Sequence, residues 1–286
     1  MSNTSILLTR YKVFGTAGRF NDIHSIEPDG SADTALTSNP AAGGQYYDYV
    51  SARYNSDRSK LALLRSKRNP EELPNVFILD VASGALTQIT SGELDFASVD
   101  WSPDDSQLLV VATDASGNYQ VQVMQADGSG LTPLTSGAME VWDAQYSPDG
   151  TQIAFSRLVS PPDRGSLRIW LMNADGSAPR QLPTGNQPAY APCWSPDGAS
   201  IAFNYARQRI CKMDIASGSV TELTQPPSGF VDDSPVWTAA GICFSRFKEL
   251  KPEFPVGAIY IMDSNGANAH AITPEADITM DFPTDG

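Results

Sequence analysis

The sequence predicts an all-β fold, a six-bladed β-propeller of four-stranded antiparallel blades, because three markers recur along it in a fixed order. The first marker is an aromatic residue followed by a polar tight turn and an apolar strand, and it returns about every 45 residues, the period of a propeller blade. The second is a strand that ends in a glycine turn, and the third is a pair of the Leu-Thr type. The aromatic residues of the first marker are Tyr54, Trp101, Tyr146, Trp194, Trp237 and Phe282.

The first marker is clearest at Trp194–Gly198, where Trp-Ser-Pro-Asp-Gly precedes the apolar run Ile201–Phe203. Pro presets φ for a tight turn, Asp hydrogen-bonds to the local backbone, and Gly tolerates a positive φ. We therefore expect structural roles for these residues, with the aromatic ring filling the wedge between neighbouring blades. After Trp237 the motif is replaced by Thr238–Gly241, which predicts a shorter hairpin in that blade.

The two ends of the sequence complement each other. The chain ends on Phe282–Gly286, a copy of the aromatic residue and turn with no strand after it, and the chain begins with Ile6–Arg10, which matches the strand Ile153–Arg157. One blade should therefore take its innermost strand from the C-terminus and its other three strands from the N-terminus. This arrangement closes the ring without an open gap between sheets. We predict one propeller domain over residues 1–286.

Composition limits the classes of partner. The 286 residues carry a formal net charge of −14, and 41% of them are hydrophobic. An acidic protein of this kind repels phosphate backbones, so nucleic acid is a poor partner. No apolar run approaches the roughly 18 residues of a membrane helix, and the N-terminus lacks the features of a secretory signal. We expect no membrane insertion, a monomer, and a cytoplasmic location for this chain, or a periplasmic one if a signal has been removed.

The repeated motifs resemble a known family. The patterns Trp-Ser-Pro-Asp-Gly followed by Ile-Ala-Phe, as in Trp194–Phe203, and Ala-Asp-Gly followed by Leu-Thr, as in Ala126–Thr135, are similar to the WD-like propeller repeats of TolB and its relatives. The resemblance extends over all the repeats. It implies the propeller fold, without the N-terminal domain of TolB or the hydrolase domain of related peptidases. Since TolB-like proteins bind other proteins, it also implies a protein or peptide ligand.

Strands of a blade alternate in direction, so their connections sort onto two faces, which we name the turn face and the loop face. The Ser-Pro-Asp-Gly turns lie on the turn face, and longer loops, which usually carry binding sites, lie on the loop face around the central channel. Carboxylates and aromatic rings at the channel mouth suit a basic peptide, a sugar or a metal ion. The predicted ligand-binding residues are Asp48, Asp95, Glu140, Trp142, Asp143, Tyr190, Asp232, Asp233 and Asp277, with Asp100 and Asp281 nearby.

A structural role competes with ligand binding for four of these acids. Arginines at the end of the following strand predict four ion pairs between adjacent loops: Asp277 with Arg10, Asp48 with Arg65, Glu140 with Arg157, and Asp232 with Arg246. The blade of Trp194 lacks both partners. Asp95 is the exception, because its blade has Ala112 at the arginine position. Asp95, Asp143 and Asp233 are therefore the acids that we expect to be most available to a ligand.

Two function hypotheses follow. Gly-x-Ser-x-Gly, His-Glu-x-x-His and Walker-type motifs are missing, and the two histidines, His24 and His270, lie away from the channel-side acids. The first hypothesis is a non-catalytic scaffold that binds a protein or peptide on the loop face, with no cofactor. The alternative is a carbohydrate-binding protein, or a hydrolase or lyase, that uses carboxylates and a cation such as Ca²⁺ in the channel.

Overall fold

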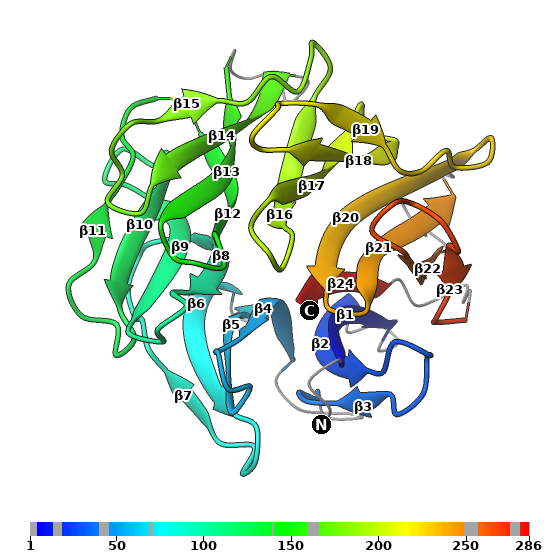
Figure 1. Cartoon of the computed structure of the whole chain (residues 1–286). Coiled ribbons are helices and arrows are strands. Elements are labelled where there is room, and N and C mark those ends of the chain that lie inside the picture. The colour runs from blue at the N-terminus through cyan, green and yellow to red at the C-terminus, as the bar shows by residue number, and fades with distance from the viewer. Residues whose placement is uncertain are drawn as a thin grey trace.

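The computed structural model has four-stranded antiparallel sheets arranged as the blades of a propeller around a common axis (Figure 1). It describes residues 5–13, 19–39, 46–68, 71–138, 140–159, 166–248, 257–274 and 281–285. All elements in these ranges are strands. The six-bladed, all-β fold that the repeats predict is confirmed. The innermost strands, in blade order, are β24 (Asp281–Asp285), β4 (Tyr47–Tyr54), β8 (Phe96–Trp101), β12 (Val141–Tyr146), β16 (Ala189–Trp194) and β20 (Phe230–Thr238).

The other strands follow outwards within each blade, and blades are numbered here from the one that contains β1. The second strands are β1 (Ile6–Val13), β5 (Lys60–Arg68), β9 (Gln107–Thr113), β13 (Gln152–Leu158), β17 (Ser200–Tyr205) and β21 (Gly241–Lys248). The third strands are β2 (Arg19–Ile26), β6 (Glu71–Asp80), β10 (Tyr119–Gln125), β14 (Leu167–Asn173), β18 (Arg209–Asp214) and β22 (Gly257–Met262). The outer strands are β3 (Thr34–Ala35), β7 (Leu86–Gln88), β11 (Thr132–Pro133), β15 (Arg180–Gln181), β19 (Val220–Glu222) and β23 (His270–Ala271).

The first blade is built from both ends of the chain, as the matching termini predict. Strand β24 pairs antiparallel with β1, with Thr9 opposite Phe282 and Arg10 opposite Asp281. The sheet order is β24-β1-β2-β3, so only the innermost strand comes from the C-terminal end (Figure 1). Every blade thereby has a neighbour on each side, and the ring needs no unpaired closing edge.

The hydrophobic core lies in the seams between blades. The phenylalanines of the apolar second strands, Phe155, Phe203 and Phe244, are fully buried. In the seam between the fourth and fifth blades, Ile169 and Leu171 pack with Trp194 and Phe203. Burial of one such side chain contributes about 1.5–3 kcal/mol. The second strands are buried on both faces, so one face of a blade packs against the preceding blade and the other against the next.

The Leu-Thr marker has a repeated structural role. The hydroxyl of the threonine accepts a hydrogen bond from the backbone N–H that begins the third strand's buried run, as Thr135 does from Val121 at 3.0 Å. The same bond joins Thr37 to Ile23, Thr90 to Val76, Thr224 to Ile210 and Thr273 to Ile259. The glycine of the preceding turn is needed for close approach, since a Cβ on Gly128 would lie 2.5 Å from the Ile89 carbonyl oxygen of the blade before.

Candidate functional site

The innermost strands carry a repeated β-bulge that re-aims their side chains. The pairing register with the second strand shifts between Trp142 and Gln145 and between Asp233 and Val236, with equivalent shifts in the second and fifth blades. At the bulge, Asp143 has a φ of 48° and Ser234 has a φ of 54°. A bulge leaves residues unpaired and bends the strand, so it directs side chains away from the regular ladder.

Side chains from non-adjacent blades interact across the ring axis. Asp143 of the fourth blade interacts electrostatically with Arg53 of the second blade, and Asp233 of the sixth blade with Asp143. Blades two, four and six share no seam, so these interactions cross the space that the innermost strands surround. The Asp143 side chain is nevertheless exposed to solvent. We call the space around the ring axis, which Arg53, Asp143 and Asp233 face, the channel.

Burial within the ring disfavours the charged forms of these acids. Desolvation by the surrounding strands raises the pKa of the Asp143 carboxyl group, and the nearby Arg53 opposes this shift. Burial raises the pKa of Asp233 to about 6; a hydrogen bond from the Ser234 N–H at 2.7 Å opposes the shift, and the charge of Asp143 adds to it. Tyr190 of the fifth blade hydrogen-bonds to Asp233, and burial followed by the charge of Asp233 raises the pKa of its phenol. The predicted residues Asp143, Tyr190 and Asp233 thus form one group, which we call the channel cluster.

The neighbouring residue Asp232 has a different role. Its carboxylate receives two hydrogen bonds from the Arg246 guanidinium, at 2.6 Å from Nε and 2.8 Å from Nη2, and its side chain is 0% exposed. The predicted Asp232–Arg246 ion pair is confirmed. Adjacent residues of a strand point to opposite faces, which explains how Asp232 is enclosed while Asp233 reaches the channel.

The predicted ion pair between Asp48 and Arg65 is wrong. Arg65 lies opposite Tyr49 in the strand register, and its guanidinium lies over the rings of Tyr47 and Phe77, at 4.4 and 3.9 Å from their centroids. Asp48 accepts a hydrogen bond from the Asn21 N–H of the first blade at 3.1 Å. The physical reason is register: Asp232 lies one residue closer to its aromatic marker than Asp48 does, and a shift of one residue turns a side chain to the other face.

The fourth blade departs from the prediction in the same way. Arg157 pairs in register with Val141, the residue after Glu140, and its guanidinium lies 5.4 Å from the centroid of the Trp170 ring. Within the described residues, no ion pair joins Arg157 to Glu140. Glu140 acts instead on Tyr119 of the third blade, where its negative charge contributes to a raised phenol pKa.

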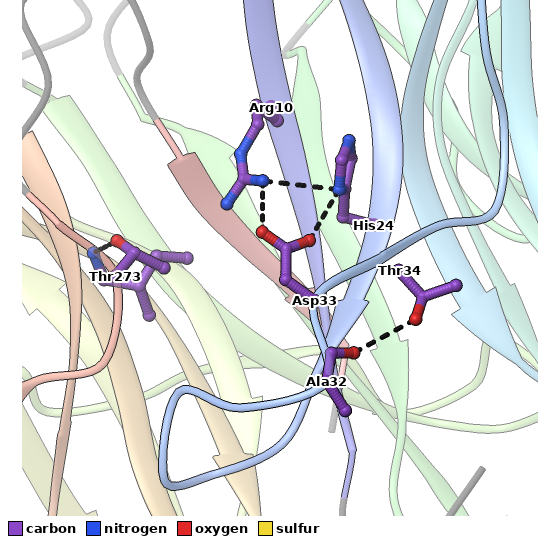
Figure 2. Close-up of polar contacts among 7 residues, drawn as sticks. Arg10, His24, Ala32, Asp33, Thr34 and Thr273 are labelled. Atoms are coloured by element: carbon purple, nitrogen blue, oxygen red, sulfur yellow. Dashed lines mark hydrogen bonds and ion pairs between the residues drawn. The ribbon is translucent and has the colours of Figure 1, made fainter.

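The fourth predicted pair cannot form a described contact, because Asp277 lies outside the described residues. Its proposed partner Arg10 forms an ion pair with Asp33 and lies 3.4 Å from the Nδ1 of His24 (Figure 2). His24 Nδ1 is also 2.7 Å from the second carboxylate oxygen of Asp33. This network joins β1, β2 and the loop before β3, so it ties together the strands of the first blade. His24 therefore has a polar structural role in the first blade.

Asp95 has a partner that the sequence pattern did not indicate. The Tyr119 hydroxyl donates a hydrogen bond to Asp95 Oδ2 at 2.6 Å. Burial and then Asp95 raise the pKa of Tyr119 to about 12. The Tyr119 ring also lies 5.0 Å from the predicted site residue Trp142 of the next blade. Asp95, Tyr119, Glu140 and Trp142 therefore gather at the seam between the third and fourth blades, apart from the channel cluster.

Sequence reasoning missed Arg53 and misjudged Asp100. Both precede an aromatic marker, and this position contacts the next blade: Asp100 accepts a hydrogen bond from the Tyr146 N–H at 2.9 Å, as Gln145 does from Trp194 at 3.1 Å. Asp100 is thus part of a seam and is buried. One sequence signal could have identified this contact: the residue before the aromatic marker is polar or charged in several repeats. Asp281 lies opposite Arg10 in the strand register.

Two classes of site are not found in the described part of the chain. There, no three His, Cys, Asp or Glu side chains lie together as a metal site. The described residues also contain no helix that could span a membrane. Cys193, Cys211 and Cys243 are buried and form no disulfide bond. Burial raises the pKa of the Cys211 thiol to about 12. These thiols pack as small apolar groups at neutral pH.

A family model described as the TolB beta propeller domain matches residues 29–284. The chain belongs to the TolB β-propeller family. No curated protein matches it in sequence. Its fold is similar to a structure designated TolB from Agrobacterium tumefaciens, with 15% identity, a TM-score of 0.69 and 98% of each chain covered. For TolB from Acinetobacter baumannii the identity is 20%, the TM-score 0.67, and the match covers 99% of this chain and 64% of that one.

Enzymes share the fold as well. An oligogalacturonate lyase from Vibrio parahaemolyticus is 13% identical, with a TM-score of 0.57 over 95% of this chain and 79% of that chain. At these identities the likeness concerns the fold, and function must be argued from the site.

Proposed function

We propose that this TolB-family propeller is a non-catalytic scaffold that binds a basic segment of a partner protein, with a Lys or Arg side chain entering the channel from the loop face. The observation that carries the proposal is the channel cluster, in which Asp143 and Asp233 from different blades interact beside Tyr190. The nearby guanidinium groups are those of Arg53, which acts on Asp143, and Arg207, which acts on Tyr190. A cation in the channel would stabilise both carboxylates, whose ionised forms the surroundings disfavour.

The remaining site residues support a peptide rather than a small ion. Trp142 and Tyr119 form an aromatic pair at the seam on the loop face, with Asp95 and Glu140 beside it. Aromatic rings next to carboxylates favour side chains that combine an apolar stem with a positive charge. Because Lys67 and Lys248 lie at the loop-face ends of β5 and β21, a partner with mixed charge would also be oriented there.

Calorimetric titration with short arginine-rich and lysine-rich peptides tests the proposal. Binding to the wild-type protein is expected to weaken roughly tenfold in Asp143→Asn and in Asp233→Asn, since each removes a charge that contacts the cation. Glu93→Gln is the matched control, because Glu93 is an exposed acid outside the channel. Binding should also weaken as the pH falls below about 6, where Asp233 takes up a proton. Equal affinity in all variants would reject the channel as the binding site.

Catalysis by the same cluster is the second candidate function. A carboxyl group with a pKa of about 6, as at Asp233, can accept or donate a proton near neutral pH. Oligogalacturonate lyases, one of them in complex with manganese, are among the proteins of similar fold. Ca²⁺ or Mn²⁺ titration followed by thermal unfolding separates the two functions, because an ion that binds the folded state must raise its stability. A large shift together with turnover of a glycoside or lactone would favour the enzyme.

A further inference from the structure

The tight turns of the turn face form a nearly continuous ring, in which each turn contacts the turn of the preceding blade. The contact is made by the turn residue in the left-handed conformation, which is Arg58, Asp105, Gly150 or Gly198, with φ between 60° and 69°. Asp105 of the third blade accepts hydrogen bonds from the Ser56 N–H and hydroxyl of the second blade, both at 2.8 Å. A Cβ on Gly150 would lie 3.3 Å from Pro103.

The sixth blade lacks this turn residue. Its hairpin closes between Thr238 and Gly241, which pair directly, whereas in the fifth blade the residues between the paired positions Trp194 and Ile201 include Ser195–Gly198. The shorter hairpin predicted from the sequence is therefore present. The short hairpin of the sixth blade offers no counterpart of Gly198 to contact Pro196 and Asp197 of the fifth blade.

A cleft of about 640 Å³ occupies the place of the missing turn, and we call it the turn-face notch. The corresponding cleft between the fourth and fifth blades, where the turn is complete, measures about 310 Å³. The notch is lined by residues of both blades, including Pro196, Asp197, Trp237, Ala240, Asp263 and Asn265. The shorter hairpin therefore leaves an open cleft, and the neighbouring turns do not fill it.

The missing turn also uncovers an aromatic ring. The equivalent residues Trp101 and Trp194 are 7% and 5% exposed, but Trp237 is only half-buried. The indole nitrogens of Trp101 and Trp194 donate to a carbonyl oxygen of the preceding blade, at 3.2 and 3.4 Å. Within the described residues, the Trp237 indole makes no such bond. Trp237 thus offers both a ring face and an N–H donor to a ligand in the notch.

The second blade contains an example of a cation that stacks on the equivalent aromatic residue. There the Arg58 guanidinium lies 3.9 Å from the centroid of the Tyr54 ring and donates to the backbone carbonyl of Ser5 in the first blade. In the notch, the amine of Lys212 is 6.0 Å from the Trp237 ring and donates to the Ser264 carbonyl at 3.1 Å, at the edge of the opening. The carboxylates of Asp197 and Asp263 add negative charge to the lining.

We propose that the turn-face notch binds an arginine-bearing tight turn of a partner protein, with the guanidinium stacked on Trp237 and held by Asp197 and Asp263. The notch lies at the position of a tight turn that the other described full repeats contain and the sixth blade lacks. The stacked Arg58 supplies an internal example of the interaction, and the acidic lining selects a cation. The notch lies on the face opposite the loop-face entrance of the channel, so this site is independent of the channel cluster.

A cyclic peptide that copies Tyr54–Leu61, and therefore carries the turn of Arg58, is the probe. Binding is followed by the NMR signal of the Trp237 indole N–H, assigned with Trp237→Phe. The signal is expected to shift on titration, and affinity should fall about fivefold when the peptide's arginine is replaced by glutamine, the loss of an exposed cation–π contact. Asp197→Asn and Asp263→Asn should each weaken binding severalfold, and added salt should do the same.

A filled-notch variant provides the matched control. In it, Thr238–Gly241 is replaced by the complete turn Ser195–Ser200 of the fifth blade, which is expected to keep or raise the melting temperature and to abolish binding. A folded filled-notch variant that still binds the peptide would overturn the proposal. So would equal affinity for the glutamine peptide, or an unshifted Trp237 signal at millimolar peptide.

Discussion

Arg246 and Asp232 form a two-bonded ion pair inside the sixth blade, at 2.6 Å from Nε to Oδ1 and 2.8 Å from Nη2 to Oδ2. The Arg246 guanidinium also lies 4.7 Å from the centroid of the Tyr260 ring. The hydrogen bonds to Asp232 hold the pKa of Arg246 above its usual value. Because Asp232 and Asp233 are neighbours in β20, we expect loss of this ion pair to affect both the stability of the protein and the position of the Asp233 side chain.

Asp232→Ala should lower the free energy of unfolding by about 3 kcal/mol, because it leaves the guanidinium of Arg246 buried without its counter-charge. Urea unfolding measures the change. Glu222→Ala is the control: the Arg209–Glu222 pair spans 2.7 Å, but both side chains are 34% exposed, so its loss should cost at most about 1 kcal/mol. Similar losses in the two variants would show that enclosure of Asp232 does not strengthen its pair.

The stability of the protein should depend on the ionisation of Asp233. Its pKa is raised to about 6 in the folded state, against about 3.9 in an unfolded chain. The folded state therefore holds the proton more tightly, and stability is lost as the pH rises from about 4 through about 6. Asp233→Asn should be more stable than the wild type by about 1–2 kcal/mol above pH 6, and this advantage should vanish below about pH 4. A constant difference across the pH range would contradict the raised pKa.

Asp100 should be important for the seam between the third and fourth blades. Its carboxylate accepts the Tyr146 N–H at 2.9 Å in a buried setting. Asp100→Ala leaves that donor unsatisfied, at a cost of about 1–3 kcal/mol. Asp100→Asn keeps an acceptor oxygen and should cost clearly less. Denaturant unfolding gives the two values, and amide hydrogen exchange at Tyr146 locates the effect, since faster exchange is expected only in the alanine variant.

Asp95 should contribute to the raised pKa of Tyr119. The pKa of Tyr119 is raised to about 12, first by burial and then by the hydrogen bond to Asp95, so Asp95→Asn should lower it towards 10. Phenolate absorbance, with Tyr119→Phe to identify the signal, measures the shift. Asp95→Ala should reduce stability by only about 1 kcal/mol while weakening binding of a basic peptide on the loop face. A larger effect on stability than on binding would show that Asp95 serves the fold alone.

Sequence patterns predicted the parts of this structure that depend on local chemistry. The recurrence of Trp-Ser-Pro-Asp-Gly, the glycine turns and the Leu-Thr pairs determines the blades, because turn formation and strand alternation need only neighbouring residues. The match between Ile6–Arg10 and the strand Ile153–Arg157 predicted the composite first blade. The absence of a full turn after Trp237 was visible as well.

Residue spacing predicted the wrong ion-pair partners where the direction of a side chain depends on the register of a bulged pair of strands. Asp48, Glu140 and Asp232 all lie five or six residues before an aromatic marker, yet only Asp232 meets its arginine. The reason is that one residue of slip across a bulge exchanges the two faces of a strand.

The amino-acid sequence by itself determined the number of blades, the closure of the ring and the shortened hairpin, since each follows from repeated motifs and turn residues that can be recognised along the chain. Only the tertiary structure decided that Asp143, Tyr190 and Asp233 share the channel with Arg53 and that Trp237 borders a cleft. Those groupings join residues of different blades. Their contacts arise from how the blades twist and pack around the axis, which no short stretch of sequence specifies.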